Sequence, residues 1–83
     1  MRYRVRVEVS LKPGHSDPEG EMTAKSLKEL RYPVETVKVS KVYEIDLSTK
    51  SLKEAERYVD EMCRRLLANP TKDDYRFTIE EVK

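Results

Sequence analysis

The sequence predicts an α+β fold, a two-layer sandwich with two helices on one face of a mainly antiparallel sheet, in the order β-α-β(β)-α-β. Segments with the two-residue period of strands stand at both ends of the chain, and a well-capped helical segment precedes the last of them. No linker or low-complexity tract divides the 83 residues. We therefore expect a single domain over residues 1–83.

The clearest helix is predicted to begin after Ser51. Ser51 and Glu54 have the spacing of a capping box, in which each side chain accepts a hydrogen bond from a backbone N–H that the first turn leaves unpaired. Seven apolar residues then recur at spacings of three and four and are expected on one face: Leu52, Ala55, Val59, Met62, Cys63, Leu66 and Leu67. Pro70 ends the helix, because a proline biases the residue before it away from helical angles.

The two ends of the chain alternate between apolar and polar residues, which is typical of strands that are buried on one face. The apolar residues of the first segment are Tyr3, Val5, Val7, Val9 and Leu11, and they alternate with Arg2, Arg4, Arg6, Glu8 and Ser10. The apolar residues of the last segment are Tyr75, Phe77 and Ile79, and they alternate with Arg76, Thr78 and Glu80. Each segment is predicted to be a half-buried strand.

The other helix, which comes first in the chain, is predicted to begin at Asp17-Pro18, because Asp is a good N-cap and Pro suits the first helical position. Its apolar face is short, with Ala24, Leu27 and Leu30 aligned, and Pro33 lies beyond its end.

Residues 34–47 allow two interpretations, because Val37, Val39, Tyr43, Ile45 and Leu47 all occupy odd positions. A hairpin with a three-residue connection would keep these side chains on one face, and so would one long strand bent near Lys41. A continuous strand of this length would span about 40 Å and would have to extend into another subunit. With either interpretation, the element order is broadly ferredoxin-like.

Composition limits the possible partners. Seventeen basic and sixteen acidic side chains leave a formal charge of +1, so no overall field attracts nucleic acid or anionic lipid. No stretch approaches the roughly 18 apolar residues of a membrane-spanning helix. We expect a soluble, cytoplasmic protein that does not bind nucleic acid or a membrane and that completes its small core by oligomerisation.

The chain offers few residues for chemistry. His15 lies beside Ser16 and Asp17, but a catalytic triad depends on geometry in space and not on adjacency, so His15 is interpreted as a solvated loop residue. One histidine and the single cysteine, Cys63, do not make a usual zinc site. Neither Gly14 nor Gly20 belongs to a phosphate-binding motif. No catalytic, cofactor-binding or metal-ligating residue is therefore predicted.

A basic strand face raises an alternative function, that of a ferredoxin-like module that binds RNA or senses a small ligand. Arg2, Arg4 and Arg6 share this face, but RNA-binding sheets also display aromatic residues on it. Tyr3 points the other way, and Phe77 is in phase with the predicted core. The RNA interpretation therefore stays the alternative.

Several segments resemble the PurS family, the small subunits of phosphoribosylformylglycinamidine (FGAM) synthase. They are the first strand up to Leu11-Lys12, Asp17-Pro18-Glu19-Gly20 at the start of the first helix, residues 37–47, Cys63-Arg64-Arg65-Leu66-Leu67-Ala68-Asn69-Pro70, and Asp74-Tyr75-Arg76-Phe77 leading into Glu80-Glu81-Val82. The run from Cys63 to Asn69 followed by Asp74-Tyr75 is the most specific part. The family usually has glycine near the end of the first helix, where this chain has Arg31-Tyr32-Pro33.

The resemblance implies a single PurS-like domain without catalytic residues of its own. It implies a dimer, in some members a larger assembly, that joins a glutaminase subunit (PurQ) to an ATP-dependent synthetase subunit (PurL) in purine biosynthesis. The small subunit would help ammonia pass between them, and ATP and magnesium would be used by the synthetase subunit.

The loop after the last helix is the predicted partner contact, because loops seldom need a fixed sequence merely to close. Its candidate interface residues are Asn69, Pro70, Asp73, Asp74 and Tyr75.

Overall fold

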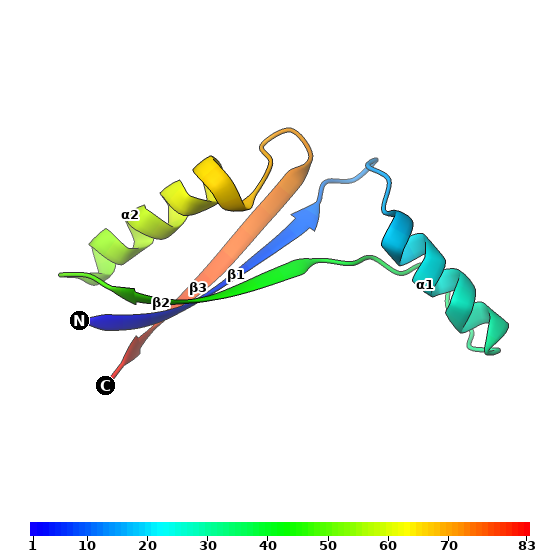
Figure 1. Ribbon diagram of the computed structural model, residues 1–83, viewed down its shortest axis with the longest axis horizontal. Coiled ribbons are helices and arrows are strands. Elements are labelled where there is room, and N and C mark those ends of the chain that lie inside the picture. Colours follow the sequence, from blue (N-terminus) through cyan, green and yellow to red (C-terminus); the bar gives the residue numbers. More distant parts are fainter.

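A computed structural model describes all 83 residues and confirms the α+β class and the element order (Figure 1). The elements are β1 (Arg2–Leu11), α1 (Pro18–Glu29), β2 (Lys41–Ser48), α2 (Leu52–Met62), a π-helical turn η1 (Cys63–Leu67) and β3 (Asp73–Val82).

The three strands form an antiparallel sheet in the order β2-β1-β3. The predicted phase of β1 and β3 is confirmed by the register, in which Val7 faces Tyr43 on one side and Phe77 on the other. Val5 and Val7 are fully buried, since they lie on the central strand. The apolar residues of the two outer strands are half-buried, so the core is centred on β1.

Helix α2 lies across one face of this sheet (Figure 1). The predicted cap is present, because the Ser51 hydroxyl accepts a hydrogen bond from the Glu54 N–H and the Glu54 carboxylate accepts one from the Lys50 N–H, both at 3.2 Å. Val59 and Cys63 are fully buried against the sheet. The helix therefore supplies the second layer of the core.

The end of this helix differs from the prediction at Leu66, whose surface is 82% exposed. The turn from Cys63 to Leu67 is π-helical, and the Ala68 N–H donates to the carbonyl oxygen of Cys63 across five residues. A π turn holds more residues than an α turn, so it rotates the following side chains around the axis. Ala68 is buried in consequence, and Leu66 points to solvent.

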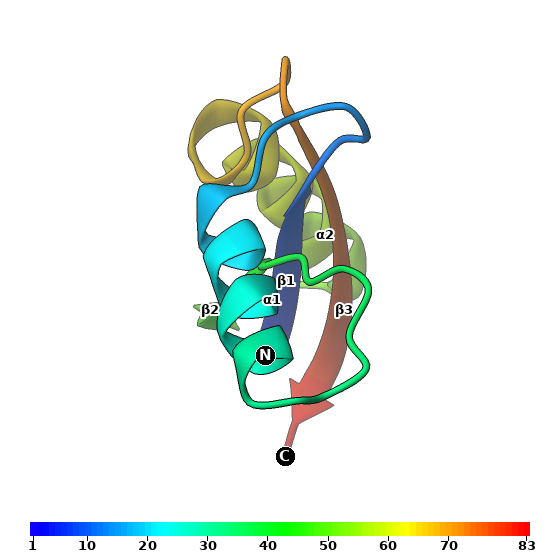
Figure 2. The same ribbon diagram turned by 90° about the vertical axis from the view of Figure 1, so that its right-hand side faces the viewer.

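Helix α1 lies beyond the end of the sheet, in the long connection between the neighbouring strands β1 and β2 (Figure 1). Viewed along the long axis, α1 and the segment after it are nearest to the viewer (Figure 2). The chain measures 51 × 30 × 13 Å, and its radius of gyration of 16.4 Å exceeds the roughly 12 Å of a compact chain of this length. The α1 region therefore extends as an arm from the sheet.

Residues 34–47 follow the single extended path and do not form a hairpin. Only the part from Lys41 onward pairs with β1, while residues 32–40 run alongside α1 without regular secondary structure (Figures 1 and 2). The bend near Lys41 marks the point where the chain leaves its own sheet.

Helix α1 ends in a Schellman motif that does not contain glycine. The Tyr32 N–H donates to the Leu27 carbonyl and the Arg31 N–H to the Lys28 carbonyl, at 3.1 and 2.9 Å. This geometry requires a left-handed residue after the cap, and Arg31 adopts it with φ = 72°. Arg31 thus occupies the position where glycine is favoured.

Arg31→Gly is expected to raise the free energy of unfolding by up to about 1 kcal/mol, because a side chain in the left-handed region costs about 1–2 kcal/mol and glycine recovers part of this despite its more flexible unfolded state. Chemical denaturation at a fixed protein concentration measures the change. Arg31→Ala is the control, since alanine has the same steric cost. An equal gain from both variants would contradict the explanation.

Candidate functional site

Hydrogen bonds within the loop between η1 and β3 stabilise its conformation. The Asn69 N–H donates to the Asp73 carboxylate at 2.9 Å, and the Asp73 N–H donates back to the Asn69 carbonyl at 2.8 Å. The side-chain oxygen of Asn69 accepts from the Thr71 N–H at 2.9 Å, which is an Asx-turn. Pro70 is exposed between these contacts. Asn69 and Asp73 therefore stabilise the conformation of the loop.

Asp74 links this loop to the end of β1 through an ion pair. Its carboxylate accepts a hydrogen bond from the Lys12 ammonium at 2.8 Å, and the Lys12 N–H donates to the Lys72 carbonyl at 2.7 Å. The ion pair is exposed, so its own contribution to stability is small, about 0–1 kcal/mol. One face of the Asp74 side chain stays open to solvent.

Tyr75 joins the sheet to α2. Its hydroxyl donates to the Asp60 carboxylate at 2.6 Å, and the Arg64 guanidinium donates to the other oxygen at 2.8 Å. These two donors lower the pKa of Asp60, and the bond to Asp60 raises the pKa of Tyr75. Burial raises the pKa of the adjacent Cys63 thiol. The hydrogen bonds of Asp60 to Tyr75 and Arg64 were not predicted from the sequence, because they depend on how α2 crosses β3.

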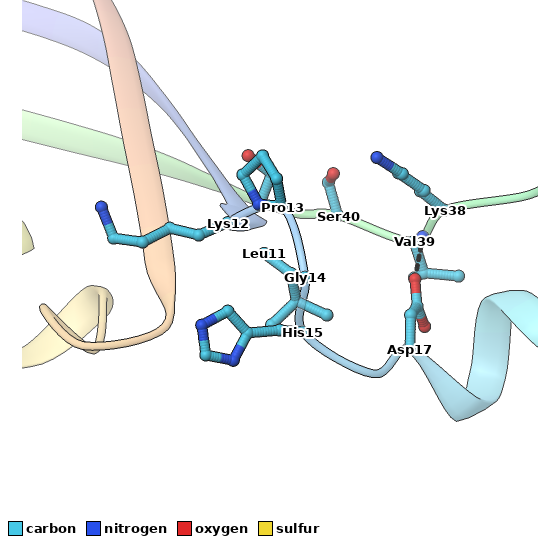
Figure 3. Close-up of a pocket in the computed structure, with 10 residues that line it drawn as sticks. Leu11, Lys12, Pro13, Gly14, His15, Asp17, Lys38, Val39 and Ser40 are labelled. Atoms are coloured by element: carbon cyan, nitrogen blue, oxygen red, sulfur yellow. Dashed lines mark hydrogen bonds between the residues drawn. The ribbon is translucent and has the colours of Figure 1, made fainter.

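A hollow lies where β1 passes into α1, with a volume of about 100 Å³ (Figure 3). Asp17 turns its carboxylate away from His15 and toward Val39 (Figure 3). It accepts from the Gly20 N–H at 2.9 Å and the Val39 N–H at 2.8 Å, and these bonds lower its pKa. The predicted N-cap is confirmed, and the same carboxylate also ties the extended segment to α1.

His15 is exposed, as the sequence interpretation expected, and its ring points away from Asp17 (Figure 3). No group of three or more histidine, cysteine, aspartate or glutamate side chains is arranged to hold a metal ion. No helix is long and apolar enough to cross a membrane.

The face of the sheet opposite α2 carries the arginines of β1. Arg6 pairs with Glu44 at 3.2 Å, and Arg4 lies 3.7 Å from Asp46. Across the other strand, Arg76 pairs with Glu8 at 2.9 Å. Carboxylates of β2 therefore compensate Arg4 and Arg6, and the aromatic residues Tyr75 and Phe77 pack on the other face against the core.

If this loop contacts a partner subunit, as the family resemblance implies, Asp74→Ala is expected to weaken that binding by about two- to fivefold, since the Asp74 carboxylate is an exposed charge beside the loop. Binding of the purified glutaminase and synthetase subunits that the resemblance implies can be measured by calorimetry. Lys12→Ala is the matched control, because it breaks the same ion pair from the other side. An equal loss in both variants would assign the effect to the ion pair and not to contact with a partner.

Comparison with known proteins identifies the family. The family described as "PurS: Phosphoribosylformylglycinamidine (FGAM) synthase" matches residues 4–81. The chain belongs to the PurS family. It is thus a subunit of FGAM synthase and part of an enzyme only within that complex, in agreement with the sequence prediction.

Individual relatives cover nearly the whole chain. The PurS subunit of Archaeoglobus fulgidus is 45% identical over 76 residues, which are 90% of this chain and 95% of the relative. The structure of Thermus thermophilus PurS matches with a TM-score of 0.89 and 38% identity over the full length of both chains. The structure of PurLQS from Thermotoga maritima contains a chain of the same fold, with a TM-score of 0.88 and 22% identity over 96% of this chain and 99% of that one.

Proposed function

We propose that this chain is the non-catalytic bridging subunit of FGAM synthase in purine biosynthesis. In this role it holds a glutaminase subunit (PurQ) and an ATP-dependent synthetase subunit (PurL) together and helps ammonia pass from one to the other. ATP and magnesium are then used by the synthetase subunit, and the chain itself acts as a single unit over residues 1–83 in the cytoplasm.

The family match over residues 4–81 is the observation that carries this proposal. The PurLQS structure from Thermotoga maritima supports it, because a chain of the same fold occurs there in a complex with that name. The surface of this chain is also suited to contacts. Leu52, Tyr58 and Leu66 on α2 and η1 are partly or largely exposed, although the rest of the surface is rich in charge.

Ammonia transfer explains why such a subunit is needed. A reactive nucleophile that forms in one active site and is used in another requires the two sites to be aligned and shielded from water. A scaffold supplies both through shape and contact, and its own side chains need not take part in the chemistry.

We also propose that the working form is a homo-oligomer, either a dimer or a pair of dimers. The extended shape supports this, since the arm formed by α1 and residues 32–40 leaves the core of its own chain. Apolar side chains on this arm are exposed, with Met22 at 62% and Leu30 at 68%. A second copy would cover part of this surface.

Reconstitution tests the bridging role. The cognate large subunits are assayed for the amidine product with and without this chain, once with glutamine and once with ammonia as the nitrogen source. We expect the chain to be required with glutamine and dispensable with ammonia. Product formation that is indifferent to the chain in both assays would overturn the proposal, and RNA or small ligands would become the candidates to test.

A further inference from the structure

Strand β3 leaves one long edge of the sheet unpaired. It lies on the opposite side of β1 from β2 and pairs with β1 alone (Figure 2). The Lys12 N–H donates to the Lys72 carbonyl in continuation of the same register, so the even-numbered residues of β3 direct their backbone groups toward β1. Alternate residues of an antiparallel strand point to opposite sides. The N–H and C=O groups of Tyr75, Phe77 and Ile79 therefore point outward.

This edge is long and regular. Natural edge strands are often short, bulged or broken by proline, because an unprotected edge recruits further strands. Strand β3 pairs with β1 at ten consecutive positions, from Asp73 to Val82, without a bulge. That segment contains neither proline nor lysine. The edge is therefore suited to accept another strand through backbone hydrogen bonds.

The apolar side chains of β3 restrict the strand that could pair here. Tyr75, Phe77 and Ile79 pack against the core on the α2 face but are only half-buried, and β1 lies beside them on one side alone. Because side chains alternate between the faces of a sheet, a strand with apolar residues at alternate positions would cover their open side.

The charges of β3 indicate a basic residue in that strand. Asp74 and Arg76 are already paired with side chains on or just after β1. Glu80 and Glu81 are exposed and form no ion pair within the chain. Opposite charges across a strand pair are favourable, so a lysine or arginine beside this end of β3 would complement the two carboxylates.

We propose that the outer edge of β3 binds an extended strand of another protein, a partner subunit of the complex. The strand carries apolar residues at alternate positions and a basic residue near Glu80 and Glu81. The inference deepens the proposed bridging role, on which it rests, because it specifies a surface by which the chain holds a partner and the kind of segment that the partner supplies.

A second copy of this chain is the other candidate for the β3 edge. The homo-oligomer proposed above uses the arm, which continues from β2 on the far side of the sheet (Figure 1). If copies also paired through β3, every chain would bind further copies on both sides. Contacts of that kind need not close into a finite oligomer. An edge that binds a different protein avoids this growth.

Amide hydrogen exchange tests the edge directly. In the chain alone, the N–H groups of Tyr75, Phe77 and Ile79 are expected to exchange faster than those of Arg76 and Thr78, which point toward β1. Exchange in the presence of the purified glutaminase and synthetase subunits is quenched and measured at single residues by mass spectrometry. We expect exchange at the three outward groups to be at least about tenfold slower in the complex, because each group gains a hydrogen bond.

A backbone methyl group gives the matching perturbation. Cys63 allows the chain to be assembled by ligation of residues 1–62 to a synthetic segment that begins at this cysteine. N-methylation of Phe77 removes an outward N–H and keeps every side chain. We expect binding of the partner subunit to be at least about tenfold weaker, because a hydrogen bond is lost and the methyl group separates the strands. N-methylation of Lys83, beyond the end of β3, is the control.

Glu81→Lys tests the sign of the charge on the partner strand. It is expected to weaken binding by about two- to fivefold. Glu81 lies opposite the uncharged Tyr3 of β1, so the change leaves the ion pairs of the sheet in place. Glu56→Lys, at an exposed position of α2, is the control. Equal losses in both variants would assign the effect to net charge and contradict a basic residue at this end of β3.

The outcomes distinguish the edge from the function. Unchanged exchange at the outward groups on binding, or undiminished binding by the chain methylated at Phe77, would overturn the strand pairing, and product formation from glutamine would still support the bridging role. Protection of these groups in the chain alone, rising with concentration, would mean that a second copy occupies the edge and would also overturn the inference. Failure of the unmethylated chain to bind either subunit would overturn the proposed function, and the inference with it.

Discussion

Gly20→Ala is expected to lower the free energy of unfolding by about 2 kcal/mol, although alanine is the better helix former. A Cβ atom at this position would lie 2.3 Å from the Val37 carbonyl oxygen and 2.7 Å from an Asp17 oxygen. Real Cβ atoms do not approach backbone oxygen so closely, so α1 and the extended segment must move apart. The bond from the Val39 N–H to Asp17 would lengthen with them.

Denaturation at a fixed protein concentration and amide exchange of Val39 measure these effects. Ser26→Ala is the matched control, because Ser26 is exposed on the same helix. If helix propensity alone decided the outcome, Gly20→Ala would be stabilised by about 1 kcal/mol. Such a gain, with unchanged exchange at Val39, would mean that α1 does not pack on this segment as described.

Val7→Ala is expected to destabilise the sheet by about 2 kcal/mol. Val7 is fully buried at the centre of β1, between Tyr43 and Phe77, and its truncation removes two carbon atoms from a site that the neighbouring strands cannot close. A chain of this length has a total stability of about 4–12 kcal/mol. The variant therefore loses a substantial fraction of it.

Thermal and chemical denaturation check this prediction. Arg6→Ala is the control from the adjacent position on the opposite face, where the exposed ion pair with Glu44 contributes at most about 1 kcal/mol. Similar losses in both variants would indicate that the two faces of β1 are not distinguished as the structure has them.

Much of the local structure could be predicted because it depends on near neighbours. The capping box at Ser51, the N-cap at Asp17 and the alternation of β1 each arise within a few residues, and all three are confirmed. The exposure of Leu66 could not be predicted, because apolar residues spaced three and four apart do not distinguish a π turn from a regular α-helix. The extended path of residues 34–40 could not be distinguished from a hairpin, because both keep the apolar residues at odd positions on one face.

The candidate loop was found by resemblance and not by chemistry. Its residues Asn69, Asp73 and Tyr75 are explained in the structure by hydrogen bonds within the chain, whereas Pro70 and Asp74 keep open surface for a partner. A role for this loop in assembly stays a prediction. Asp60 and the second bond of Asp17 were missed, because each depends on contact between elements distant in sequence.

The sequence by itself determined the class of fold, the starts of the helices, the apolar phase of the strands and the PurS family, because these follow from local spacing and from shared residues. Only the tertiary structure decided that β1 is the central strand, that α1 leaves its own sheet and that the edge of β2 stays open. Those features depend on which surfaces meet across the chain, where burial and backbone pairing compete over long separations.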